Sequence, residues 1–563
     1  MSGYKSDELM TTKKIEELLE QIEELQYENA QLKKCKRYGL VWEEKEEKFE
    51  KKAKNALPIL KEKGGKFKDI KDKQNPDDDY NILIEGDNFH SLSVLNYTHR
   101  KKIDVIYIDP PYNTGKKDFI YNDHFVDRED CFRHSKWLSF MSKRLKLAKN
   151  LLKDDGIIFI SIDDNEFAQL KMLCDDIFSE NNFITMISWQ GMDTVKNDAK
   201  YFSSNHEHIL VYSINKDKVK IKGLKRSAKH NKVYKNLDND PKGDYLLTPL
   251  HAKSGTKGKI FKFVFNNGVS WQPPQGTFPR FSVPTLKELD DSHSIYFGKN
   301  NKSIPQKKTY LKDVSDYVKL TTFWDYKFAG STRQSNKELA DIIYKGAFQN
   351  PKPSSLIKIL VNSVSKKNSI ILDFMAGSGT TGHAVLALNK EDGGNRKFIL
   401  CTNNENKICE NVTWERIKRV SKGYKKQNGD KVEGLGGNLK YLKTDFIKID
   451  NNSDNLKEKT VEASTEILCF RENTFNKVID DYKKHKIKVF ESKNKYTAIL
   501  FDLFYFDEFI AELKKLKDKK VSIYVFSYTK DFSASEFGDL KIDFTVEAIP
   551  EKVLETYKKI FNF

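Results

Sequence analysis

The chain reads IDVIYIDPPY from Ile103 to Tyr112. The first six of these residues are mostly β-branched or aromatic, which is typical of a buried strand. The strand ends at the rigid tetrapeptide Asp109-Pro110-Pro111-Tyr112. Open α/β sheets bind their ligands at the carboxyl ends of strands. The stretch therefore predicts both a sheet and a ligand site at its edge.

Similar apolar runs lie on both sides of this strand, with helix-like stretches between them. They are residues 81–87, 156–163, 369–373 and 398–401. Such alternation predicts an α/β domain with a parallel sheet. The rhythm fades between about 189 and 344, which we interpret as an insertion. After about 450, three further strands and two helices predict a separate α/β unit.

The first segment has a short amphipathic pattern. Its apolar positions, spaced 3-4-3-4-3 with one polar exception, are Ile15, Leu18, Ile22, Leu25, Asn29 and Leu32. This spacing is typical of a paired-helix seam, in which one polar residue fixes the register. Fewer than three heptads are marginal for a coiled coil that is stable by itself. The pattern therefore fits either a coiled-coil dimer or a helix that packs against its own chain.

The composition is that of a folded, basic protein. The 563 residues are 38% hydrophobic and carry a net charge of +17. That charge suits a polyanion such as nucleic acid, although a Lys-rich genome would produce it too. No membrane-length apolar run or signal core occurs, so we expect a cytoplasmic protein without a membrane contact. The six Cys form no CxxC pair, so no zinc site or disulfide framework is expected.

A second motif, residues 373–381, reads DFMAGSGTT. A strand, a Gly-rich turn and a helix start are typical of a site for a nucleotide-like cofactor, because glycine lets the backbone approach the ligand. The chain contains no GxxxxGK[ST] motif, so triphosphate hydrolysis is not supported.

The tetrapeptide at 109–112 suits an exocyclic amine of a nucleobase, which is a poor nucleophile. Asp109 can accept one amine hydrogen and favour the positive charge that develops on alkylation. The Pro110 carbonyl, held by the stiff Pro110-Pro111 backbone, can accept the other hydrogen. Tyr112 offers a flat face for an unstacked base.

The sequence resembles the modification (Mod) subunit of type III restriction-modification systems, among the beta-order amino-methyltransferases. The matching stretches are 38–42, 83–88, 104–115, 159–166, 205–207 and 373–381. The resemblance implies a Rossmann-like, circularly permuted class I methyltransferase sheet. It also implies methyl transfer from S-adenosyl-L-methionine to the N6 amine of a flipped adenine in a short DNA sequence.

The domains expected from the resemblance and the chain's own patterns follow one another along the chain. They are an N-terminal helical segment (1–55), a catalytic part (80–188), a target recognition domain (189–345), a cofactor part (346–450) and a C-terminal α/β domain (451–563). The expected catalytic residues are Asp109, Pro110, Pro111 and Tyr112. The expected cofactor residues are Asp373, Ala376, Gly377, Ser378, Gly379, Thr380, Asp87, Asn88, Lys352 and Glu405.

The insertion holds nine Lys or Arg residues within 216–235, beside aromatic and polar groups suited to base edges. The expected double-stranded DNA contacts are Lys216, Lys218, Lys220, Lys222, Lys225, Arg226, Trp271, Arg280 and Arg333. Most of the lysines are expected to touch phosphates only. A homodimer and a separate restriction subunit are the expected protein partners.

Two other functions and two other roles for single residue pairs compete with the leading interpretation. The same pocket chemistry serves the N4 amine of cytosine, although Asp before Pro-Pro favours adenine in the resemblance. The chain is alternatively a DNA-recognition subunit that mainly recruits a nuclease. His206-Glu207 resembles an acid–base pair, but we favour a structural strand. Asp163-Asp164 suggests a metal, but the implied reaction needs none.

Overall fold

The computed structural model describes residues 40–49, 56–116, 118–255, 260–298, 300, 303–449, 453–516, 518–527, 534–538 and 540–561. They form two compact units. The first comprises residues up to 219, residues 324–358 and residues from 367 onward; the second comprises 220–323 and 359–366. The expected heptad seam at 15–32 lies outside the described residues.

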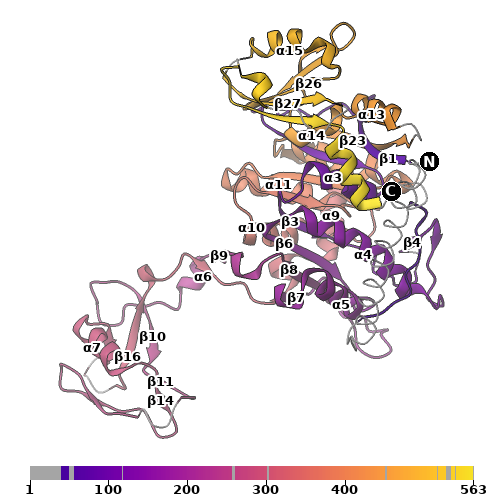
Figure 1. Cartoon of the computed structure of the whole chain (residues 1–563). Coiled ribbons are helices and arrows are strands. Elements are labelled where there is room, and N and C mark those ends of the chain that lie inside the picture. Colours follow the sequence, from indigo (N-terminus) through magenta and orange to yellow (C-terminus); the bar gives the residue numbers. More distant parts are fainter. Residues whose placement is uncertain are drawn as a thin grey trace, which may run out of the picture. The chain divides into compact units, whose positions relative to one another are not determined.

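A ten-stranded sheet forms the centre of the first unit (Figure 1). In spatial order its strands are β1 (Ala56–Glu62), β23 (Asn438–Lys448), β2 (Tyr80–Glu85), β20 (Lys397–Thr402), β19 (Ile370–Asp373), β3 (Ile103–Ile108), β6 (Leu152–Ile162), β8 (Glu207–Ser213), β7 (Phe183–Trp189) and β18 (Phe323–Trp324).

The six strands from β23 to β6 are parallel to their neighbours. Strands β1 and β8 are antiparallel to the strands that flank this core. Strand β3, which ends at the Asp109 motif, precedes β19 in the chain yet lies beside it, and the permuted Rossmann-like α/β sheet is confirmed. Strands covered on both faces must be apolar throughout, which explains the continuous runs in the sequence.

Helices cover both faces of the sheet. Helices α3 (Asn88–Thr98), α4 (Arg133–Leu151) and α5 (Phe167–Phe178) share a buried apolar cluster with one set of strand side chains. Helices α9 (Thr332–Ile342), α10 (Ser354–Val364), α11 (Thr380–Asp392) and α12 (Glu415–Lys422) follow later in the chain. A Cβ on Gly382 of α11 would lie 3.0 Å from Leu400 of β20, so glycine permits this close helix–strand packing.

The second unit is built from short strands around a small core. Its elements are β9 (Leu224–Lys225), α6 (Ala228–Asn231), β10 (Tyr245–Pro249), β11 (His251–Ala252), β12 (Phe263–Val264), β13 (Ser270–Trp271), β14 (Phe278–Pro279), α7 (Val283–Asp291), β15 (Ile295–Tyr296), β16 (Gln306–Tyr310) and β17 (Tyr317–Val318). Leu250, Phe265, Trp271, Leu286 and Ile295 form the core. Its longer segment, 220–323, falls inside the expected 189–345 insertion but is narrower, because β8 and Trp324 belong to the first unit, and its second segment, 359–366, lies outside that insertion.

The C-terminal part has a five-stranded sheet of its own within the first unit. Its elements are α13 (Ser453–Glu462), α14 (Thr465–Glu472), β24 (Asn476–Asp481), β25 (Ile487–Glu491), β26 (Lys495–Leu500), α15 (Phe506–Leu513), β27 (Lys520–Phe526), β28 (Phe544–Ile549) and α16 (Glu551–Phe561). The Tyr557 hydroxyl donates to the Pro58 carbonyl over 2.6 Å, which joins α16 to β1. Among the described helices, none has both the length and the apolarity to cross a bilayer.

Candidate active site

The two motifs leave the sheet at the same edge. Strands β3 and β19 are parallel neighbours, with Val105 beside Ile371 and Ile106 beside Leu372. Asp109 follows the end of β3, and Asp373 ends β19. Parallel strands point their carboxyl ends the same way, so both loops face one space.

That space is a cavity of about 870 Å³. Its walls include residues from the catalytic motif, the Gly-rich turn and the ends of two further strands. They include Asp109, Pro110, Pro111, Phe374, Met375, Gly377, Asp87, Asn88, Thr402, Asn403, Glu405, Arg144 and Phe348. One cavity therefore joins the two segments that the sequence predicted to carry the chemistry.

Asp109 belongs to a tight polar cluster. The Lys352 ammonium lies 2.9 Å from each oxygen of its carboxylate. The Tyr112 hydroxyl lies 3.0 Å from Asp109 Oδ1 and 2.8 Å from Glu207 Oε2. Lys352 also lies 3.4 Å from Glu207. Two carboxylates thus share one cation and one hydroxyl.

The electrostatics fix the protonation of both donors. Burial raises the pKa of the Tyr112 hydroxyl well above its usual value, and the charges of Asp109 and Glu207 raise it further. Burial alone would lower the pKa of Lys352, but Asp109 and Glu207 more than offset it, so the net pKa is raised. Tyr112 therefore remains a neutral donor and Lys352 a cation.

Asp373 supports the Gly-rich turn from below the surface. Its carboxylate accepts from the Met375 amide at 3.0 Å and from the Thr381 hydroxyl at 2.5 Å. Burial raises the pKa of Asp373 to about 7, although both hydrogen bonds oppose the rise. Its visible role is to hold the turn in shape.

The glycines of the turn have backbones that larger residues rarely adopt. Gly377 has φ +46° and lines the cavity, and a Cβ there would lie 3.0 Å from the Phe348 ring. Gly379 has φ +76° and is the residue before α11. The turn is compact because side chains are absent at these two positions.

The side chains of Ser378 and Thr380 do not face this cavity wall. Arg416, a fully buried residue of α12, donates to the Ser378 hydroxyl at 3.2 Å and to the Thr380 hydroxyl at 2.8 Å. The Ala376 amide donates to the Cys401 carbonyl, which ties the turn to β20. These three expected cofactor residues stabilise the turn through contacts with neighbouring elements.

Polar groups that follow two other strands, β2 and β20, line the same cavity. Asp87 caps α3 by accepting from the Phe89 amide at 2.8 Å. Asn88 accepts from Arg144, a buried residue of α4 that sequence reasoning missed. Glu405 lies in a short helix after β20, and burial raises its pKa above the usual value. The structure therefore places Asp87, Asn88 and Glu405 in the wall of the cavity.

Two residues have contacts that the sequence did not indicate. Lys352 was expected near a cofactor carboxylate, but its ammonium contacts Asp109. Glu207 was assigned to a structural strand; it begins β8, and its carboxylate also reaches Tyr112. The available signal was the alternation of side chains in extended backbone: Glu207 lies between His206 and His208 in sequence, so its side chain points to the opposite side.

The expected DNA contacts are distributed over both units. Lys216 donates to the Phe183 carbonyl, Lys218 pairs with Asp154 at 2.8 Å and Arg333 lies 3.6 Å from Asp193, all in the first unit. In the second unit, Lys220, Lys222, Lys225 and Arg280 are exposed, and Arg226 donates to the Ser315 carbonyl. Trp271 is 4% exposed and lies in that unit's core, because its ring packs with Phe265 and Leu286.

Comparison with known proteins gives consistent matches. A family model described as DNA methylase matches residues 103–413. The Mod subunit of the type III restriction-modification enzyme StyLTI from Salmonella typhimurium is 33% identical over 453 residues, covering 73% of this chain and 68% of the relative. The EcoPI Mod subunit of Escherichia phage P1 is 33% identical over 379 residues, covering 58% of each. The chain thus spans little more than half of the EcoPI subunit.

A solved structure also aligns with the chain. It is a putative DNA modification methylase from Thermus thermophilus, complexed with S-adenosyl-L-methionine. The alignment covers 57% of this chain and 89% of the other at 14% identity, with a TM-score of 0.28.

Proposed function

This chain belongs to the DNA methylase family, and on that premise we propose that it methylates the N6 amine of an adenine in a short DNA sequence. The methyl donor is S-adenosyl-L-methionine. One observation carries the proposal: a single cavity is lined by Asp109-Pro110 and by the turn that contains Gly377. An amine acceptor and a cofactor turn in one cavity allow transfer between two bound molecules.

The side chains in the cavity fit a nucleoside with a charged amino-acid tail. The space beside Gly377 is one that a Cβ would fill, which lets a ligand approach the backbone. The carboxylates of Asp87 and Glu405 can accept hydrogen bonds from ribose hydroxyls or a base amine. Phe348 and Phe374 provide apolar walls. When bound, the sulfonium donor supplies an already activated methyl group.

The chain's own groups then act on the target amine. Asp109 accepts one amine hydrogen and stabilises the positive charge that develops on the nitrogen. The Pro110 carbonyl accepts the other hydrogen. Tyr112 and Lys352 hold the Asp109 carboxylate in place through the contacts described above. The base must leave the duplex to reach this cavity, at a cost of a few kcal/mol.

Adenine is favoured over cytosine by the residue before the two prolines. Among the beta-order enzymes that this sequence resembles, Asp directly before the two prolines is typical of those that methylate adenine, and here that residue is Asp109. The N4 amine of cytosine remains the second candidate, because it also offers two hydrogens to the same two acceptors.

Target recognition is the role that we propose for the unit at 220–323. Its exposed cationic side chains, among them Lys225 and Arg280, support phosphate contacts with double-stranded DNA. A homodimer and a separate restriction subunit are the proposed protein partners, and the cytoplasm, where host DNA lies, is the proposed location. The heptad spacing at 15–32 supports the homodimer. The lack of a GxxxxGK[ST] motif in this sequence means that DNA cleavage driven by triphosphate hydrolysis needs a second chain.

Long-read sequencing of DNA from cells that express the chain tests the proposal. We expect N6-methyladenine in one sequence context with the wild type, and none with Asp109→Ala. The matched control is Asp77→Ala, which removes an exposed carboxylate from a turn.

If N4-methylcytosine were found in that context instead, the target base would be cytosine, the second candidate, and not adenine. Equal methylation by Asp109→Ala and the wild type would exclude the proposed role of Asp109. Retained DNA binding by purified Asp109→Ala shows that the variant is folded.

A further inference from the structure

Two histidines and a carboxylate lie together beside the catalytic cluster. His208 lies in β8 and His206 directly precedes that strand, and two positions apart in extended backbone place side chains on one face. Strands β6 and β8 are antiparallel, with Ile162 opposite His208. Asp164 lies in the turn after β6 and His206 directly before β8, so the pairing of these strands brings both segments to the same end of the sheet.

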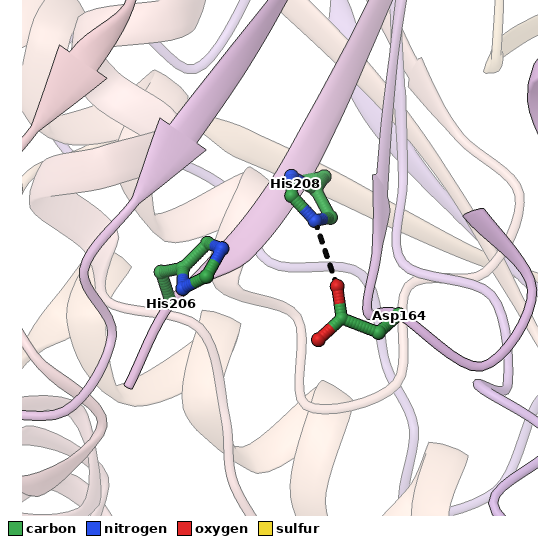
Figure 2. Close-up of side chains that lie close together, drawn as sticks. All are labelled: Asp164, His206 and His208. Carbon is green, nitrogen blue, oxygen red and sulfur yellow. Dashed lines mark hydrogen bonds and ion pairs between the residues drawn. The ribbon is translucent and has the colours of Figure 1, made fainter. Parts of the chain in front are cut away.

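The three side chains converge in the structure. Figure 2 shows both imidazole rings and the Asp164 carboxylate facing one another. One ligand atom from each residue lies within 4.8 Å of the others. His208 Nε2 is 3.0 Å from Asp164 Oδ1. Within the described part of the chain, no other such group of three His, Cys, Asp or Glu residues occurs.

The arrangement is partly fixed before any ligand binds. The His208 side chain is only 12% exposed, and its ring packs against Phe167 with centroids 4.5 Å apart. The Asp164 carboxylate is 70% exposed, and His206 is exposed as well. One ligand is therefore rigid, while the other two can rotate by the small amount that closes the site.

We propose that Asp164, His206 and His208 bind a divalent transition-metal ion such as Zn²⁺, Co²⁺ or Ni²⁺. A tetrahedral ion with bonds of about 2.0–2.1 Å needs ligand atoms roughly 3–3.5 Å apart, so only His206 must move inward. Two imidazoles favour these ions over Mg²⁺ and Ca²⁺, which prefer oxygen ligands. Three protein ligands leave one position for water.

The site lies on the opposite face of β8 from the catalytic cluster. Glu207 lies between the two histidines in sequence, and its carboxylate contacts Tyr112 and Lys352. An ion that joins His206 and His208 to the loop after β6 would fix the backbone on both sides of Glu207, at the start of β8. The ion is thus a positioning device and takes no part in methyl transfer, which needs no metal.

Calorimetric titration of the chelator-treated full chain with ZnCl₂ tests the site. We expect the wild type to bind a single ion at this position, and His206→Ala to bind it more weakly. The loss should be at least the roughly 10–100-fold that follows removal of a group that merely orients a metal ligand. His206 is exposed and precedes β8, so its replacement leaves the fold intact.

The matched control is His485→Ala. His485 pairs with Asp481 at 2.5 Å, which resembles the His208–Asp164 pair without a second histidine, so we expect unchanged affinity. Absorption of the Co²⁺ form identifies the ligands, since the exposed Cys131 would add a thiolate charge-transfer band that imidazole and carboxylate lack. Equal Zn²⁺ affinity of the wild type and His206→Ala would overturn the proposal, as would a thiolate band. Asp109→Ala retains all three ligands, so failure of methyl transfer and failure of metal binding are separable.

Discussion

The end of β3 and the unit at 220–323 use charged side chains in opposite ways. There are only a few charged side chains around Asp109, and each is held by buried or half-buried partners at distances of 2.8–3.4 Å. In the second unit, many cationic side chains are exposed and the small core is apolar. Chemistry on an amine needs acceptors at fixed positions, whereas affinity for phosphates needs mainly charge. A single substitution should therefore cost far more in the first region than in the second.

After the loss of Asp109 itself, the largest effect should follow the loss of Lys352. In Lys352→Met, the carboxylates of Asp109 and Glu207 lose their shared cation and Asp109 shifts, and a misplacement of about 1 Å costs roughly 100-fold in rate. We expect kcat to fall by about that factor, measured with purified enzyme and DNA, while cofactor affinity is retained. Lys358→Met, which removes a half-exposed ion pair with Glu391, is the control. Weaker cofactor binding with unchanged kcat would instead assign Lys352 to the cofactor carboxylate.

A side chain at Gly377 should weaken cofactor binding. Overpacking costs about 1–3 kcal/mol, so Gly377→Asp should raise the cofactor Kd by roughly 10–100-fold in calorimetry. Gly393→Asp is the matched control, because Gly393 also has a positive φ but nothing lies within 4 Å of its added Cβ. Similar affinities for both variants would contradict a cofactor contact at Gly377.

Asp373 should give the first unit a measurable pH dependence. Its folded pKa of about 7 lies above the usual 3.8, so its contribution to stability is complete below about pH 4 and is lost as the pH rises through 7. The Asn side chain of Asp373→Asn does not titrate, so this variant does not lose that contribution. Between about pH 4 and 7, its free energy of unfolding in urea should therefore rise relative to that of the wild type by at most about 1.4 kcal/mol per pH unit.

Asp392→Asn supplies the opposite case. Arg396 holds the pKa of Asp392 below its usual value, so this carboxylate stays ionised above about pH 4. The difference in the free energy of unfolding between Asp392→Asn and the wild type should therefore stay constant between about pH 4 and 7. A constant difference for Asp373→Asn as well would show that the Asp373 carboxyl titrates in the ordinary range.

The smallest effect is expected in the second unit. Replacing Lys225 and Arg280 by Ala should weaken DNA binding a few-fold and lower the slope of log affinity against log salt by about one for each phosphate that the variant no longer neutralises. The methylated sequence should not change, and Lys477→Ala in the C-terminal sheet should leave the slope unaltered. A changed methylated sequence would mean that these residues read bases, so the contrast between the regions would be smaller than we propose.

Much of the first unit was predictable, because buried parallel strands leave continuous apolar runs. The strands at 103–108, 370–373 and 397–402 fall where the sequence predicted them. The second unit was harder, since its strands are mostly two to five residues long and too short to show a period. Trp271 illustrates the difficulty: a lone aromatic residue suits a base contact or a core equally well, and only packing decides.

The sequence by itself determined the positions of the strands, the order of the two motifs and the rigid turn at Asp109-Pro110-Pro111, while the permuted sheet followed from the family resemblance. The first three features are local, because strand length, proline stiffness and glycine freedom are properties of consecutive residues. The partners of Asp109 were decided only by the tertiary structure. Lys352 and Glu207 lie 243 and 98 positions away from Asp109 in the chain, and no local pattern specifies which cation meets which carboxylate. The same reason hid the group of Asp164, His206 and His208, which exists only because β6 and β8 pair in one register.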